Sequence, residues 1–572
     1  MTHADADVTE QRVEVAAPRY ASVREVDIDA QSDRRGRALV ARRWVVRLVA
    51  FTGFIGATAT FLLTPVNGNI RYELGVKFAS VFSPSETFSH RPLAFRLLLD
   101  SMSRVAEPLS FGLSSFEVLL RLIGLGLAVT AGILLWLGLR NYDVVAPGLH
   151  TVVAVAALVF MGTSFSLEPD WMAVVLTIAG TGVALLGRRR LAWPMAVLSS
   201  TFFVAAAGMK IITVLPALIG LLVVAVLDRR QVARTMATSA VVGVLYIIAT
   251  AVWVPWEITW LVDIRLLTPS VTERLVSHGP RFLLESAVRW PAVLMFPAAL
   301  ILAGRLERLL LVAALLLSVG PIVFQAQYFG YHGAALCVVS AIAALRALRH
   351  RVTPPVGVTV AAVVLAASLM TTASGAWRVD HRAVMVVVTV GVTLLGIGWA
   401  LGVRGRQVPE RPAGLLVAAC ATLALLYPAM TPFASLMVRM SPSGVLVATP
   451  LNGLSEREIA ARQIRARIGG PDVPVTYLTF GDWTYFIRNP TVCRYPSPLF
   501  LQRTRYTLTH VGSPSYEENL ACLSEPTSRW LIMDEKWFPI SRTPPEVQAR
   551  IHAEWNCGDG FESGGLKVCP RR

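Results

Sequence analysis

The sequence predicts a polytopic α-helical membrane protein, with about 13 transmembrane helices and a C-terminal extracytoplasmic α/β domain. Its 572 residues are 54% hydrophobic and 16% charged, and the mean hydropathy of +0.56 is not that of a soluble globular protein. Apolar segments close to the ~20 residues that cross a bilayer recur as far as residue 431. Arginine clusters occupy every second connection, which marks those connections as cytoplasmic.

The net charge of +16 could suggest a nucleic-acid partner. However, the arginines lie in short connections between apolar segments, so we interpret them as signals that set the membrane topology. The partner that the composition predicts is the lipid bilayer, and no nucleic acid is expected.

The chain is expected to begin with a disordered cytoplasmic extension over residues 1–42, which are polar and contain no apolar core. An arginine-rich stretch then precedes the first span, at about 46–64. We interpret this span as an uncleaved anchor with the N-terminus inside, because a cleaved signal begins nearer the N-terminus and has a shorter apolar region. It opens a transmembrane domain over 43–431.

Further spans are expected along the rest of that domain, at about 116–138, 148–166, 171–187, 192–208, 211–227, 236–255, 291–304, 309–325, 333–347, 355–373, 383–402 and 413–431. The alternation of cytoplasmic and outside connections places the C-terminus outside. The protein is expected in the plasma (inner) membrane. The outer face then holds a long first loop (65–114), a second long loop (256–290) and a tail (432–572) large enough for a small domain.

Four of the six cysteines lie in the tail, and the other two lie in spans. An even number of cysteines in an exported domain favours disulfides. Cys557 and Cys569 flank a glycine-rich turn and form the favoured pair, which leaves Cys493 with Cys522 by elimination. Zinc is less favoured, because no CxxC or HxxxH spacing is present.

The tail also shows the pattern of a small α/β domain. A helix is expected from a capping box at Ser455 as far as Gly469, and a second helix over 546–555. Strand-like runs cover 473–480 and 529–534, and a hairpin should join the last two cysteines.

The first outside loop carries more charge than a linker needs. Glu73 could act as an acid or base, and Arg71, Tyr72, His90 and Arg91 could bind a phosphorylated substrate. The alternative is an amphipathic helix on the membrane surface with its charges facing water.

Other outside connections add candidates at the same membrane face. Glu168 and Asp170 precede a span, where the alternative is a helix start that favours carboxylates. Lys210 could bind a lipid-linked phosphate or simply snorkel to the interface. Arg265 and His332 complete the set of substrate-binding candidates, although a lone histidine at a span end is often structural.

The first outside loop resembles that of GT-C glycosyltransferases, which are polytopic enzymes that move a sugar from a polyprenyl phosphate to an acceptor. The resemblance rests on an Arg-Tyr pair, a following helix and a basic-Pro-Leu element, here Arg71, Tyr72, His90, Arg91, Pro92 and Leu93. The tail run VPVTYLTFGDWTYFIRNPTVCRYPSPLF (473–500) is similar to the strand, glycine, tyrosine-containing helix and Arg-Tyr run of many exported domains of that superfamily.

The family pattern has an acidic residue just before the Arg-Tyr pair, whereas this chain has Asn67, Gly68 and Asn69 there, and Glu73 follows. Glu168 or Asp170 would match a second acidic site in the next outside loop. The resemblance therefore implies Glu73, Glu168 and Asp170 as catalytic candidates.

The function implied is transfer of a sugar from a polyprenyl-phosphate donor to a cell-envelope glycan, lipid or protein acceptor on the extracytoplasmic face. A carboxylate would be the general base. Arginine, lysine or a divalent cation (Mg or Mn) would stabilise the departing phosphate. The alternatives are a membrane transporter or flippase, an undecaprenyl-linked glycan polymerase or ligase, and a non-catalytic scaffold.

Overall fold

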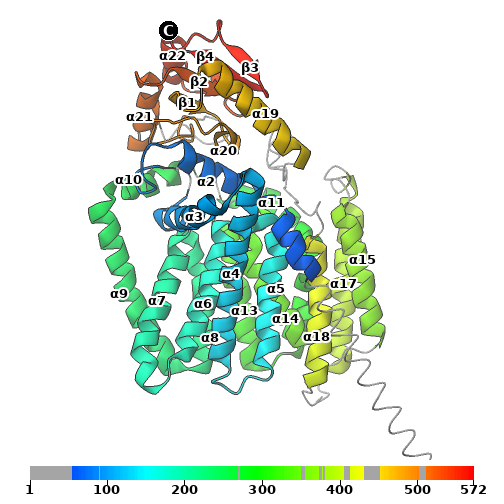
Figure 1. Ribbon diagram of the computed structural model, residues 1–572. Coiled ribbons are helices and arrows are strands. Elements are labelled where there is room, and N and C mark those ends of the chain that lie inside the picture. Colours follow the sequence, from blue (N-terminus) through cyan, green and yellow to red (C-terminus); the bar gives the residue numbers. More distant parts are fainter. Residues whose placement is uncertain are drawn as a thin grey trace, which may run out of the picture. The chain divides into compact units, whose positions relative to one another are not determined.

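A computed structural model describes residues 55–572 except for 89–90, 268–270, 326–327, 350–353, 373–376, 378–379, 405–411, 431–450 and 502–510. The predicted N-terminal extension and the beginning of the first span lie outside these residues. The described chain from Gly56 to Arg572 forms one compact unit, in which the tail is not separated from the membrane helices. Its elements are labelled in Figure 1.

The predicted fold class is confirmed, because apolar helices occupy the expected spans. The first is helical from Ile55 to Leu63 within the described residues. The others are α4 (Leu113–Leu139), α5 (Pro147–Phe165), α6 (Pro169–Leu186), α7 (Ala192–Gly208), α8 (Val214–Leu227), α9 (Arg229–Trp253), α12 (Phe296–Leu302), α13 (Arg305–Phe324), α14 (Ala334–Leu348), α15 (Pro354–Thr372), α17 (Arg382–Val403) and α18 (Pro412–Leu426).

Fewer helices cross a full bilayer by length alone than the sequence predicts. Within the described ranges, six helices have the length and apolar character of a span, and five apolar helices are shorter, at 10–17 residues. The expected span 291–304 is only a short turn, η5 (Pro291–Met295), and the helix α12. It bends by 100° from α11 (Val271–Arg289), so the two together make at most one broken span.

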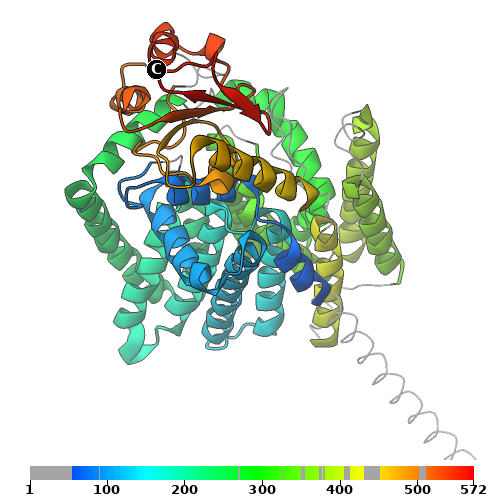
Figure 2. The ribbon, with the colours of Figure 1, turned by 45° about the horizontal axis from the view of Figure 1, so that its top comes forward.

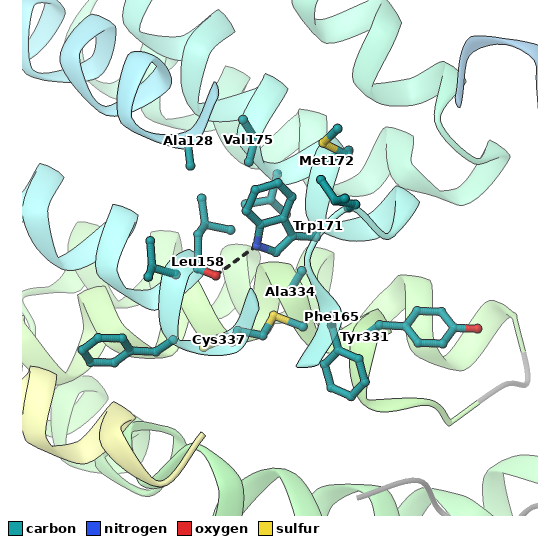
Figure 3. Close-up of a cluster of buried hydrophobic side chains, with 14 of the residues drawn as sticks. Ala128, Leu158, Phe165, Trp171, Met172, Val175, Tyr331, Ala334 and Cys337 are labelled. Atoms are coloured by element: carbon teal, nitrogen blue, oxygen red, sulfur yellow. Dashed lines mark hydrogen bonds between the residues drawn. The ribbon is translucent and has the colours of Figure 1, made fainter. Parts of the chain in front are cut away.

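The interior of the helical part is packed around Trp171, which is fully buried near the start of α6. Its indole Nε1 donates to the carbonyl of Leu158 on α5 at 3.0 Å. Figure 3 shows this bond and the apolar side chains around it. In the same view, the ring of Tyr331 lies beside Phe165 and its hydroxyl points away from the cluster. The polar end of Tyr331 is therefore directed out of the apolar core.

The first outside loop contains two helices, α2 (Gly68–Ala79) and α3 (Leu93–Ala106). Asn67 caps α2, because its Oδ1 accepts from the backbone N–H of Ile70 at 3.1 Å. The second outside loop contains α10 (Pro255–Asp263), the turn η4 (Ile264–Leu267) and α11. Nearly all of α2 is buried, so the surface-lying amphipathic helix considered from the sequence is wrong for this segment.

The tail forms a four-stranded sheet in the order β1-β2-β4-β3, seen from another side in Figure 2. Strand β1 (Val475–Leu478) pairs parallel to β2 (Trp530–Met533). Strand β4 (Leu566–Pro570) pairs antiparallel to β2 and to β3 (Phe561–Ser563). The helices of the tail are α19 (Leu451–Ile468), α20 (Trp483–Ile487), α21 (Pro514–Ala521) and α22 (Pro545–Glu554).

The predicted strands, second helix and hairpin are present, and the disulfides are Cys493–Cys522 and Cys557–Cys569, as expected. One tail prediction is wrong. The first helix begins at Leu451, so Ser455 lies inside it and cannot be its N-cap.

Contacts join the tail to the outside loops. Ser80 and Thr491 form a parallel bridge, and the carboxylate of Asp263 accepts from the backbone N–H of Ser515 at 2.9 Å. A Cβ added to Gly75 on α2 would lie 2.4 Å from the side-chain oxygen of Thr484 on α20. Helices α2 and α20 therefore approach each other as closely as a glycine allows.

Candidate functional site

Glu168 lies at the N-cap position of α6 and is completely buried. Two amides from the start of the first outside loop bind one carboxylate oxygen: Nδ2 of Asn67 donates to Oε1 at 2.7 Å, and Nδ2 of Asn69 at 3.1 Å. The guanidinium of Arg91 donates to the other oxygen at 3.3 Å. A buried carboxylate held by three donors has a fixed orientation.

The backbone just before Glu168 is unusual. Leu167 is fully buried and has a φ of 69°, in the left-handed region that favours glycine. This conformation costs a leucine about 1–2 kcal/mol. Strain of this kind is common at functional sites, where the surrounding structure compensates for it. Here it places the carboxylate of Glu168 at the beginning of α6.

A second carboxylate lies two residues further on. Oδ2 of Asp170 is 3.1 Å from Nδ1 of His332 and 3.6 Å from Nζ of Lys210. Nζ of Lys210 is also 3.4 Å from the same histidine nitrogen. Asp170 and His332 are buried, while Lys210 is partly buried. These three residues come from three separate outside connections and meet at one point.

Arg91 and Tyr331 link the surroundings of Glu168 to those of Asp170. Nε of Arg91 is 3.7 Å from Oε1 of Glu73, so this arginine lies between Glu73 and Glu168. The guanidinium carbon of Arg91 is 5.9 Å from the centre of the Tyr331 ring, and Nζ of Lys210 is 5.7 Å from it. We call Glu73, Arg91, Glu168, Asp170, Lys210, Tyr331 and His332 the ionisable cluster.

Burial shifts the pKa values of Glu168 and Lys210 in this cluster. It raises the pKa of Glu168, and the positive charge of Arg91 and the donors Asn67 and Asn69 only partly oppose this effect. Burial lowers the pKa of Lys210 to about 8, with Asp170 acting in the opposite direction. Glu168 is therefore a stronger proton acceptor than an exposed glutamate, and Lys210 loses its charge more readily than an exposed lysine.

The described residues contain no group of three or more His, Cys, Asp and Glu side chains that could hold a metal ion. Arg91 and Lys210 instead place positive charge beside the carboxylates. Dependence on a divalent cation (Mg or Mn) stays a prediction from the sequence, and we derive no step through a metal.

Several residues predicted as substrate-binding lie elsewhere. Arg71 is buried in an ion pair with Glu117. Tyr72, in contrast, packs against Phe480 with 4.9 Å between ring centres and lies close enough to Glu73 and Arg91 for their charges to act on its hydroxyl. Arg265 is exposed on η4. His90 lies outside the described residues.

Sequence reasoning missed the amides of Asn67 and Asn69. Their place just before the Arg-Tyr pair was the available signal, because these are the positions where the family resemblance implies an acid. The structure fills that place with two donors that bind a carboxylate from the next outside loop. It also brings in Tyr331, the neighbour of the predicted His332.

A groove of about 600 Å³ lies between α11, α12 and α17. Its lining is mostly aliphatic, and its charged residues are Arg281, Glu285 and Arg382, of which Arg281 and Glu285 pair with each other at 2.9 Å. Ala287 and Val293 line its wall. Arg289, which lies between these two residues in the sequence, is buried. The guanidinium carbon of Arg289 is 4.3 Å from the ring centre of Phe165, the residue that also contacts Tyr331. Arg289 therefore lies near the ionisable cluster, although it does not itself line the groove.

Together, the fold and this cluster define a polytopic membrane protein with a buried cluster of ionisable side chains and an α/β tail domain. No known family profile matches the chain, and no curated protein matches it. Solved structures do resemble it, among them "Crystal Structure of ArnT from Cupriavidus metallidurans in the apo state" and "Crystal Structure of ArnT from Cupriavidus metallidurans bound to Undecaprenyl phosphate".

The apo structure is 15% identical, with a TM-score of 0.48, and the match covers 93% of this chain and 98% of the other. The second is 14% identical, with the same TM-score of 0.48, and covers 92% and 98%. Because the likeness is this low, no function is carried over from it.

Proposed function

We propose that this protein is a membrane glycosyltransferase that moves a sugar from a polyprenyl-phosphate donor to a cell-envelope glycan, lipid or protein acceptor at the extracytoplasmic face. The observation that carries the proposal is the position of Glu168. It is a buried carboxylate of raised pKa, fixed by Asn67, Asn69 and Arg91, and it has a second carboxylate and a partly buried lysine beside it.

In the proposed reaction Glu168 accepts the proton of an acceptor hydroxyl, and the hydroxyl oxygen forms a bond to the anomeric carbon of the sugar. The bond between that carbon and the phosphate oxygen breaks, and the polyprenyl phosphate leaves with the electron pair. Glu73, on the other side of Arg91, is the second candidate for the base. Asp170 keeps His332 and Lys210 in place.

The leaving phosphate gains negative charge, so positive groups near it lower the barrier. Lys210 and Arg91 provide this charge inside the cluster, where the low local polarity strengthens their effect. Arg289 lies near the same place and could bind the phosphate through paired donors. A lipid donor also accounts for the absence of any nucleotide-binding glycine fingerprint in the sequence.

The aliphatic groove between α11, α12 and α17 suits the hydrocarbon chain of such a donor. A polyprenyl chain needs an apolar surface that opens toward the lipid, with the phosphate held near the outer face. Arg382 begins α17 at the end that the topology places outside, where it can meet an anionic head group.

A transfer assay tests the proposal. Membranes that contain the protein are incubated with a panel of radiolabelled polyprenyl-phosphate sugars and acceptor extract, and labelled product is measured for the wild type, Glu168→Ala and Glu73→Ala. We expect transfer from at least one donor and a large loss in Glu168→Ala. No transfer from any donor would contradict the enzymatic function, and wild-type rates in both variants would contradict the site.

The two alternative membrane functions are each separable from this one. A transporter or flippase would move a labelled lipid or soluble substrate without breaking the sugar–phosphate bond. A glycan polymerase or ligase would consume a diphosphate-linked oligosaccharide and leave a monophosphate-linked sugar untouched.

A further inference from the structure

We propose that Glu117 is a positioning residue, which acts through the start of α2 to hold the amides of Asn67 and Asn69 against Glu168. This inference rests on the proposed role of Glu168 and adds a residue that touches neither substrate nor reacting atoms. Glu117 lies near the beginning of α4 and is buried.

Glu117 binds the chain on both sides of the two asparagines. Its Oε2 accepts from the backbone N–H of Val66 at 2.9 Å, just before Asn67. The guanidinium of Arg71 donates to both carboxylate oxygens, with Nε to Oε1 at 2.7 Å and Nη2 to Oε2 at 2.9 Å. One carboxylate therefore fixes the residues immediately before and after the segment 67–70.

The segment between these anchors has little freedom left. Asn67 uses its Oδ1 to cap α2, which leaves its Nδ2 to donate to Glu168. Asn69 donates to the same oxygen from the first turn of the helix. A rotation or shift of the start of α2 would remove both donors at once, because neither side chain is long enough to follow.

The anchor extends into the tail domain. Nη1 of Arg71 is 3.8 Å from Oδ2 of Asp482, the residue that precedes α20, and Asp482 also forms an ion pair with Arg457 on α19. Arg71 and Asp482 are both buried. A buried, bidentate arginine pair fixes geometry better than a surface pair does. The start of α2 is thus held both by a membrane helix and by the tail.

The titration of Glu168 reports this positioning directly. The groups that act on it are the two amides and Arg91 from the first outside loop, Asp170 on its own helix, and Lys210 and Tyr331 from later connections. Replacing Glu117 by Gln removes a negative charge, and that change by itself would lower the pKa of Glu168. Loss of the two amide donors would raise the pKa. The direction of the change therefore separates positioning from simple electrostatics.

The test uses the full-length protein in lipid nanodiscs. Infrared difference spectra follow the carboxyl band of Glu168 against pH, and the band is assigned by its loss in Glu168→Gln. We expect Glu117→Gln to raise the midpoint by about one pH unit. The double variant Asn67→Ala/Asn69→Ala should give a similar rise, to which Glu117→Gln adds no further rise, because all three changes remove the same two hydrogen bonds.

Two further variants complete the design. Glu307→Gln is the matched control, because Glu307 also pairs with two arginines, Arg346 and Arg349, in connections assigned to the opposite membrane face. We expect its midpoint to equal that of the wild type. Arg71→Lys keeps the charge but loses the paired donors, and it should raise the midpoint even if Glu117→Gln does not fold.

A folded Glu117→Gln or Arg71→Lys protein whose midpoint stays at or below that of the wild type would overturn the inference. The readout does not depend on transfer activity. If the wild type transfers no sugar, the proposed function fails, while the titration still decides whether Glu117 positions the amides.

Discussion

At the scale of single residues, two amides that bind a buried carboxylate define this site. The family resemblance implies an acidic residue just before Arg71, and the chain has Asn67 and Asn69 there. The structure shows both amides binding Glu168. A carboxylate in that place would repel Glu168, whereas an amide donates to it. Our proposal therefore assigns the acidic role to the second outside connection, where the sequence also marked Glu168 as a candidate.

Replacing the proposed base tests this arrangement. Glu168→Gln keeps the shape of the side chain but cannot accept the acceptor proton, so kcat should fall by about 10²–10⁴-fold with a smaller change in KM. Steady-state assays of reconstituted protein would measure this split. Glu307→Gln should retain wild-type kcat. A kcat for Glu168→Gln within a few-fold of wild type would remove Glu168 from the role of base.

The protonation of Glu168 and Lys210 also predicts the pH dependence of transfer. Activity should fall at low pH as Glu168 becomes protonated, and burial places that limb above the ordinary range of a glutamate pKa. It should fall again near pH 8 as Lys210 loses its charge. The resulting profile of kcat/KM is bell-shaped.

Lys210→Arg provides the matching control, because arginine keeps its charge throughout the measurable range. The alkaline limb near pH 8 should disappear or move upward in this variant while the acid limb stays in place. An unchanged alkaline limb would show that another group is responsible for it.

At the scale of elements, the apolar segments and the tail strands could be predicted because their signals are local. Spans are recognised by length and hydropathy, and strands β1 and β2 by their apolar runs. The left-handed Leu167 has no comparable local signal, and the short helix α20 was indicated only by the family resemblance of the run 473–500. The meeting of Asp170 with Lys210 and His332 depends on contacts across up to 162 residues, which helix periodicity does not encode.

The close approach of α2 and α20 gives a prediction at this scale. Gly75→Leu would place side-chain atoms against the backbone of Tyr485, where even a Cβ lies 2.4 Å away. We expect a loss of about 1–3 kcal/mol in stability from overpacking, together with lower transfer activity. Thermal unfolding in detergent, followed by tryptophan fluorescence, would measure the first effect.

Gly126→Ala on α4 is the matched control, because a Cβ there has no atom within 4 Å. Its melting temperature should equal or slightly exceed that of the wild type. If Gly75→Leu and Gly126→Ala both had the melting temperature of the wild type, the packing of α2 on α20 would not contribute to stability.

At the scale of the whole molecule, contacts sort the connections into the two sets that the arginine pattern predicts. Lys210 and His332 meet Asp170, and Asp263 meets the tail, which joins connections assigned to the outside. Glu307 meets Arg346, which joins connections assigned to the inside. Which set faces the cytoplasm is still a prediction from the distribution of arginine.

Cysteine labelling in intact cells tests that orientation. Arg265→Cys and Arg305→Cys place thiols at exposed positions in the second outside loop and at the start of α13. The tail cysteines are in disulfides and Cys337 is buried, while Cys420 is half-buried within α18, so both variants are made in a Cys420→Ala background. A membrane-impermeant maleimide should label Arg265→Cys only. Labelling of Arg305→Cys instead would invert the topology.

The central claim is that a sugar–phosphate bond is broken here, and release of the lipid carrier measures this most directly. Purified protein in proteoliposomes is given a radiolabelled polyprenyl-phosphate sugar that supports transfer and its acceptor, and both products are quantified. The account predicts one polyprenyl monophosphate for each sugar transferred, and none with Glu168→Gln. Movement of the intact labelled lipid between leaflets, with no carrier released, would contradict it.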